Sequence, residues 1–131
     1  MTRTLDSEDL RRRLEADYGV SLPAFRCHGG WEVPLRQILE EAKIRGLLDG
    51  LVVEEIKEKF GGLRVYTRPP DRRADEWRRF NRKVRKIEDT SLEICEQCGE
   101  SGSQVWEGGL LLTLCGPCAA ERCALWARTT P

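Results

Sequence analysis

The sequence predicts an α+β protein with three helices, a β-hairpin and a C-terminal zinc finger of the treble-clef or zinc-ribbon type. Apolar residues recur at helical spacing in three segments, and two runs of β-forming residues flank a Gly-Gly pair. Two Cys-x-x-Cys pairs lie near the C-terminus. We therefore expect an α+β body over residues 1–93 and a finger over residues 94–131 that packs on it as one unit.

The first helix is expected to be capped by the hydroxyl of Ser7 and closed by Gly19. Residues 20–30 are rich in Gly and Pro and should form a loop. A second helix is expected from about Trp31 to near Gly46, because apolar side chains recur there at spacings of three and four residues. These repeated apolar positions predict the faces that pack on the core.

Residues 51–67 permit two interpretations. A helix over the first half would place Val52, Ile56 and Phe60 on one face. The second half alternates between apolar and polar residues and is rich in β-formers, and Gly61-Gly62 between the halves favours a turn. We therefore predict a β-hairpin.

A long helix is expected from Asp71, its predicted cap, to about Leu92, since Pro69-Pro70 ends the preceding strand. Its predicted apolar stripe consists of Trp77, Phe80, Val84 and Ile87. On a helical wheel the opposite face is strongly basic. That face carries Arg78, Arg79, Arg82, Lys83, Arg85 and Lys86.

The paired cysteines predict one structural zinc ion. Cys95 and Cys98 form the first pair, and Cys115 and Cys118 form the second pair after sixteen intervening residues. Each Cys-x-x-Cys turn can aim two thiolates at one ion, and four thiolates complete the tetrahedral coordination that Zn²⁺ prefers. A hairpin through Gly108-Gly109 and a helix after the second pair complete the expected finger.

Other uses of these residue types fit less well. Cys115-Gly-Pro-Cys118 has the form of a thioredoxin redox motif, but an upstream pair at zinc-finger spacing explains the same cysteines better. His28 is the only histidine and is not followed by the glutamate of the zinc deaminase motif. Cys27 beside His28 lacks an orienting carboxylate, so we expect Cys27 and Cys123 to be structural. No catalytic motif is present, and we expect no enzymatic activity and no small-molecule substrate.

Charge is unevenly distributed although the formal net charge is zero. Residues 72–86 contain eight basic residues and two acidic ones, whereas residues 91–131 contain five acidic and two basic residues. The basic helix is therefore a candidate nucleic-acid-binding surface, and a protein-interaction adaptor that uses the acidic finger and the hairpin is the alternative. The N-terminus lacks an apolar signal segment and no run is long enough to span a membrane, so we expect a cytoplasmic protein without membrane contact.

Six blocks of sequence carry a resemblance: Gly30-Trp31, Ile56-Lys-Glu-Lys-Phe-Gly-Gly-Leu-Arg-Val-Tyr66, Ser91, Cys95-Glu-Gln-Cys98-Gly99, Leu114-Cys115 and Cys118-Ala119. Over about residues 28–120 the chain resembles a group of small uncharacterised bacterial and phage proteins. The resemblance implies a bacterial or phage cytoplasmic context and supports the paired cysteines. The finger also resembles small zinc-finger transcription regulators that place a helix before four cysteines, although the hairpin is not part of their pattern.

Overall fold

The computed structural model describes residues 5–70 and 73–129, with side chains described up to Arg122. The described residues form a mixed α+β fold, which confirms the predicted class, but they contain four α-helices rather than three, because the expected helix of the finger is a full α-helix that begins at Gly116, within the second cysteine pair. The elements are α1 (Ser7–Tyr18), β1 (Phe25–Arg26), α2 (Glu32–Ile44), β2 (Val52–Lys59), β3 (Gly62–Arg68), α3 (Ala74–Thr90), β4 (Ser103–Glu107), β5 (Leu110–Leu114) and α4 (Gly116–Thr129). Two 3₁₀ turns, η1 (Gly29–Trp31) and η2 (Ser91–Glu93), precede α2 and the first cysteine pair.

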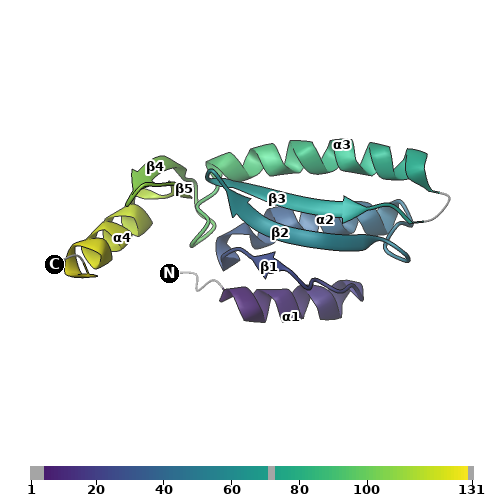
Figure 1. Cartoon of the computed structure of the whole chain (residues 1–131), viewed down its shortest axis with the longest axis horizontal. Helices are drawn as coiled ribbons and strands as arrows, with labels where there is room; N and C mark the ends of the chain where they lie inside the picture. Colours follow the sequence, from purple (N-terminus) through teal and green to yellow (C-terminus); the bar gives the residue numbers. More distant parts are fainter. Residues whose placement is uncertain (1–4, 71–72, 130–131) are drawn as a thin grey trace.

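The body is a three-stranded sheet with helices on one side. The strand order is β1-β2-β3, with β1 parallel and β3 antiparallel to β2. Helix α2 lies behind the sheet, α3 runs beside β3, and α1 lies on the side of β1 (Figure 1). The finger, made of β4, β5 and α4, extends beyond the end of the sheet at which β2 turns into β3. The main core contains Leu10, Leu14, Trp31, Leu35, Ile38, Ile56, Leu63, Phe80 and Val84, all buried.

The first helix begins one residue earlier than expected. Asp6, not Ser7, is the N-cap, and its carboxylate accepts a hydrogen bond from the backbone N–H of Asp9 at 2.8 Å. Aspartate is as good a cap as serine, so composition alone does not separate the two positions. The predicted end is confirmed: Gly19 has a φ of 65° and its N–H donates to the carbonyl of Glu15.

The predicted hairpin is confirmed, with a shift of one residue in its turn. Lys59 pairs with Gly62, so the two loop residues are Phe60 and Gly61 rather than Gly61 and Gly62. Both loop residues have positive φ, 52° and 80°, as a two-residue turn of type I′ requires. The turn thus places a phenylalanine at the exposed tip of the hairpin, with 71% of its surface accessible.

Helix α3 is shorter than the expected helix. It starts at Ala74, and its N-cap, Arg73, makes no side-chain capping bond; the predicted cap, Asp71, lies outside the described residues. It ends at Thr90 because the chain tightens into the 3₁₀ turn η2. The predicted apolar stripe is present, with three residues buried and Trp77 partly buried.

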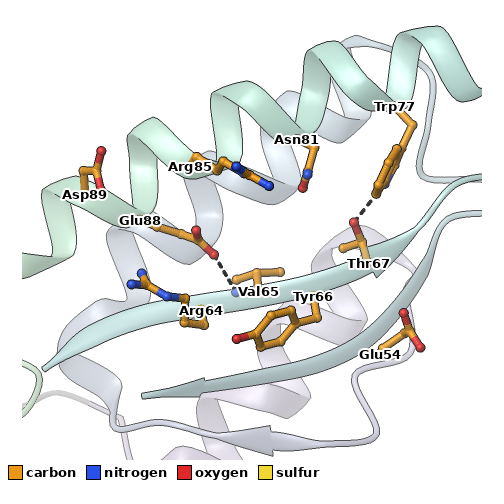
Figure 2. A pocket seen from close by; sticks show the side chains of 10 residues that line it. All are labelled: Glu54, Arg64, Val65, Tyr66, Thr67, Trp77, Asn81, Arg85, Glu88 and Asp89. Atoms are coloured by element: carbon orange, nitrogen blue, oxygen red, sulfur yellow. Dashed lines mark hydrogen bonds between the residues drawn. The ribbon is translucent and has the colours of Figure 1, made fainter. Parts of the chain in front are cut away.

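Side chains from the C-terminal half of α3 and from η2 satisfy the free edge of β3. The N–H of Val65 donates to Glu88 Oε2 at 2.7 Å, and the N–H of Leu63 donates to Ser91 Oγ at 2.8 Å. Figure 2 shows the Glu88 bond together with the bond from Trp77 Nε1 to Thr67 Oγ1, 2.9 Å long. Without these bonds the backbone N–H groups of Leu63 and Val65 would be free to pair with another strand, so α3 and η2 protect this edge of the sheet.

The buried Glu88 carboxyl makes stability depend on pH. Burial raises its pKa, against the lowering effect of the hydrogen bond from Val65 N–H. The folded protein therefore holds this proton more tightly than the unfolded chain. The contribution of Glu88 to the free energy of unfolding consequently falls as pH rises from its ordinary pKa through the raised folded value.

Glu88→Gln should remove this pH dependence while leaving an oxygen that accepts from Val65 N–H. We expect the free energy of unfolding of the variant, minus that of the natural chain, to increase with pH across that window. Urea denaturation of both chains between about pH 4 and pH 8 measures the difference. Contributions from the cysteines are common to both chains and cancel. A difference that is constant with pH would contradict the prediction.

Candidate metal centre and basic surface

The first cysteine pair lies in a tight backbone knuckle. The N–H of Gly99 donates to the carbonyl of Cys95 at 2.9 Å, and the N–H of Cys95 donates to the carbonyl of Glu100 at 2.7 Å. Gly99 has a φ of 83°, a conformation that side-chain-bearing residues rarely adopt. The turn directs the side chains of Cys95 and Cys98 toward the second pair, since all four ligand atoms gather within a few ångströms.

The second pair lies where β5 passes into α4. Strands β4 and β5 form the predicted hairpin, with Glu107 paired to Leu110 across Gly108-Gly109. Cys115 directly precedes α4, and Cys118 lies in its first turn. The N–H of Ala119 donates to the carbonyl of Cys115 at 2.9 Å, as a helical backbone bond does. Helix geometry therefore fixes the spacing between these two side chains.

The structure brings the four predicted cysteines together. Their sulfur atoms all lie within 4.8 Å of one another, and those of Cys98 and Cys115 are 3.5 Å apart. Sulfur atoms held by one tetrahedral zinc ion at bonds of 2.3 Å are about 3.8 Å apart. A disulfide would require about 2.05 Å, and all four cysteines are free. The donor set and spacing therefore fit one thiolate-binding metal ion.

The electrostatics of the cluster also favour a cation. Burial opposes ionisation of Cys95, but backbone hydrogen bonds from Cys115, Cys98 and Gln97 outweigh it and lower its pKa. The pKa of Cys98 and that of Cys118 are raised, first by burial and then by the neighbouring thiols. One thiolate is thus favoured, whereas further thiolates repel it at this spacing, so a bound cation is needed to hold all four charges.

The knuckle is bonded directly to the body. Trp31 Nε1 donates to the carbonyl of Ile94 at 3.0 Å, and the N–H of Gly30 donates to the carbonyl of Glu96 at 3.0 Å. From the finger hairpin, Thr113 Oγ1 donates to the carbonyl of Gly61 in the body hairpin. Contacts from η1 and from the hairpin tip therefore position the cysteines relative to the sheet.

Glu96, one of the acidic residues of the finger, does not lie on its surface. Its side chain is buried, and its carboxylate accepts from the N–H of Thr113 at 3.2 Å. Burial raises the pKa of Glu96 to about 7. The acidic character of the finger surface therefore rests on the exposed or partly exposed residues Glu100, Glu107 and Glu121.

Cys27 is buried in the main core, as expected of a structural cysteine. Burial, together with the nearby Glu96, raises the pKa of its thiol to about 12, which disfavours a nucleophilic role. Cys27 and His28 line a cavity of about 190 Å³ between the body and the finger. The side chain of Cys123 lies outside the described part of the chain.

The six predicted basic residues of α3 all have exposed side chains, on the face opposite the core. They fan across about half of the helix circumference rather than forming one narrow row. Two of them make ion pairs within the helix, Arg78 with Asp75 at 3.0 Å and Arg79 with Glu76 at 3.3 Å. Arg82, Lys83, Arg85 and Lys86 make no ion pair with a described residue.

A groove beside α3 was not predicted from the sequence. It has a volume of about 620 Å³ and separates α3 from the outer side of β3 (Figure 2). Arg64 and Tyr66 line it from the strand, and Trp77, Asn81 and Arg85 line it from the helix. The alternation of Leu63, Val65 and Thr67 with Arg64, Tyr66 and Arg68 was the available signal, since alternate strand residues face opposite sides of a sheet.

The tryptophans divide between core and surface. Trp31 is buried and Trp77 is partly buried, in agreement with the core positions expected from their apolar registers. Trp106 has 71% of its surface exposed, because it lies on the face of the finger hairpin opposite the small core around the cysteines. Trp126 lies outside the described side chains.

No family model matches this chain, and no curated protein or solved structure matches it either. Among the described residues, no helix is long and apolar enough to cross a membrane. Inferences about function therefore start from two features of the molecule, the four-cysteine cluster and the distribution of its charged and aromatic side chains.

Proposed function

We propose that this chain is a non-enzymatic nucleic-acid-binding protein with one structural Zn²⁺ on Cys95, Cys98, Cys115 and Cys118. Four thiolates complete a tetrahedral site and leave no position for a substrate or an activated water. A knuckle, a hairpin and a helix whose first turn carries Cys118 form a finger of the treble-clef type. The zinc ion stabilises this finger, and the basic face of α3 binds phosphate groups.

The observation that carries this proposal is the exposure of all six cations of the basic face. Four cations without ion pairs to described residues project from one half of α3, and the other two make only exposed pairs within the helix. Such exposed pairs contribute about 0 to 1 kcal/mol, so those two cations can exchange partners readily. Phosphate groups release counterions when they bind several cations together, which gives salt-dependent affinity.

Arg82→Glu combined with Lys86→Glu should weaken binding on the order of tenfold or more, because both exposed side chains change from attracting to repelling phosphate. The dependence of log affinity on log salt should become less steep by about 1.5 to 2. Fluorescence anisotropy with labelled single-stranded and duplex DNA and RNA, at about 50 and 200 mM salt, measures both effects.

Arg12→Glu combined with Arg13→Glu is the matched control. These exposed arginines lie on α1 and give the same change in net charge. An equal loss of affinity in both variants would show that net charge, rather than the face of α3, determines binding. Absence of binding by the natural chain to every probe at low salt would refute the nucleic-acid proposal.

A second candidate function, a protein-interaction adaptor, is supported by exposed apolar side chains near the finger. Phe60 at the hairpin tip and Trp106 on β4 are each 71% exposed, and Leu110 on β5 is also exposed. Large exposed aromatic residues are common anchors in protein interfaces. Failure of all nucleic-acid probes would make this candidate the leading one.

A further inference from the structure

The outer face of the sheet is open and basic. No described helix covers this face, which points toward the viewer in Figure 1. The pairing of Lys57 with both Arg26 and Arg64 places these three side chains on the outer face, since residues paired across strands share a side. The basic residues on this face and its rim are Arg26, Lys57, Lys59, Arg64 and Arg68, against the acidic Glu54 and Glu55.

An aromatic ring lies within this basic surface. Tyr66 is 40% exposed, lies on the outer face beside Glu55, and has Lys57 Nζ at 5.8 Å from its ring centre. The same ring lines the groove next to α3, whose far wall carries Arg85 and Asn81 together with the acidic Glu88 and Asp89 (Figure 2). At the hairpin tip, Lys59 Nζ lies 6.0 Å from the ring of Phe60. The outer face therefore carries two exposed rings, each with a cation beside it. Lys57 also pairs with Glu55 at 3.5 Å, and Arg68 pairs with Glu54 at 3.4 Å.

We propose that this outer face binds single-stranded nucleic acid, with one base stacked on Tyr66 and with Arg64 and Arg85 facing the flanking phosphates. The groove volume, about 620 Å³, falls within the range of small-ligand sites and accommodates one nucleotide. The inference deepens the proposed function, on which it rests, and extends it from α3 to the neighbouring sheet.

The combination of groups favours a single strand over a duplex. Bases of a duplex are stacked on each other, so exposed rings on a protein surface have no base face to contact. A single strand offers both unstacked bases and phosphates, which match the exposed rings and the neighbouring cations. Asn81, at the groove wall, supplies an amide that can donate to and accept from a base edge. An acidic peptide would use the cations but would leave Tyr66 without a stacking partner.

The test compares Tyr66→Ala with Tyr66→Trp in the zinc-loaded full chain. Labelled ribo- and deoxyribo-oligomers of about 12 nucleotides and a duplex of equal length serve as probes. Tyr66→Ala should weaken binding of the single strands roughly five- to tenfold without changing the salt slope, because no charge is removed. Tyr66→Trp should bind at least as well as the natural chain, and duplex affinity should not change in either variant.

Trp106→Ala is the control, since it removes a more exposed aromatic ring from the finger. Equal single-strand affinity in Tyr66→Ala and the natural chain would overturn the inference while leaving the basic-helix proposal intact. The converse result, loss with Tyr66→Ala but none with Arg82→Glu and Lys86→Glu, would support the sheet and reject the helix. Failure of the natural chain to bind any single-stranded probe would overturn the inference as well.

Photo-crosslinking of a 4-thiouridine oligomer gives an independent readout. Trypsin cuts after Arg64 but not after Arg68, because Pro69 follows it, so Tyr66 lies in the peptide Val65–Arg72, while Trp77 lies in the separate peptide Ala74–Arg78. A crosslink on the Tyr66 peptide supports the inference. Crosslinks confined to peptides of the finger or of α1 would contradict it.

Discussion

Cys98→Ser is expected to release the metal and unfold at least the finger. The sulfur of Cys98 lies 3.5 Å from that of Cys115 within the four-cysteine cluster, and the small core of the finger is built around the cysteines themselves. Structural zinc binding in isolated fingers provides about 10 to 16 kcal/mol, and that free energy is coupled to folding. A serine hydroxyl is a far poorer zinc ligand than a thiolate, so most of this stabilisation should be lost.

The measurement is zinc content together with circular dichroism. The natural chain should contain one zinc ion, which thiol modification should release, whereas Cys98→Ser should contain almost none. Cys27→Ser is the matched control, because Cys27 is also a free cysteine but lies buried in the body and does not belong to the cluster. It should retain the metal even if the core is weakened. Full metal retention in Cys98→Ser would refute the zinc assignment.

Gly30→Ala is expected to disrupt the junction between the body and the finger. A Cβ atom at Gly30 would lie 2.2 Å from the carbonyl oxygen of Cys95 and 2.5 Å from the carbonyl carbon of Glu96. Both atoms belong to the backbone, so no side-chain movement can relieve the overlap. The hydrogen bond from Gly30 N–H to Glu96 would also lengthen. We expect a loss of about 3 kcal/mol or more, equivalent to a fall in Tm of about 10 °C.

Thermal unfolding of the zinc-loaded protein measures this effect. Gly116→Ala is the control, because a Cβ atom at Gly116 would have no neighbour within 4 Å although it lies between Cys115 and Cys118. Alanine also favours the helix that contains position 116, so the control should change stability by less than about 1 kcal/mol. Equal Tm values for the two variants would show that the finger does not pack closely against Gly30 of η1.

The local elements of this protein were predictable because their signals lie within short segments. Alternation over residues 62–68 and a Gly-rich turn specify the hairpin, and the paired cysteines specify a metal-binding finger through spacing alone. The basic side of α3 follows from helical periodicity, since the core can bury only one face. The small errors, such as Asp6 rather than Ser7 as the cap, occur where neighbouring residues are equally suitable.

The sequence by itself thus determined the two hairpins, the main helices, the cysteine cluster and the basic helix face, but not strand β1 and turn η1, which begin in the predicted loop over residues 20–30. Only the tertiary structure decided that Glu96 is buried, that Trp106 is exposed, that Gly30 contacts the knuckle and that Tyr66 faces an open groove. Each of these depends on which distant segment packs against the residue. A residue is buried only when a second segment packs against it, and the periodicity of one segment does not specify which other segment will cover it.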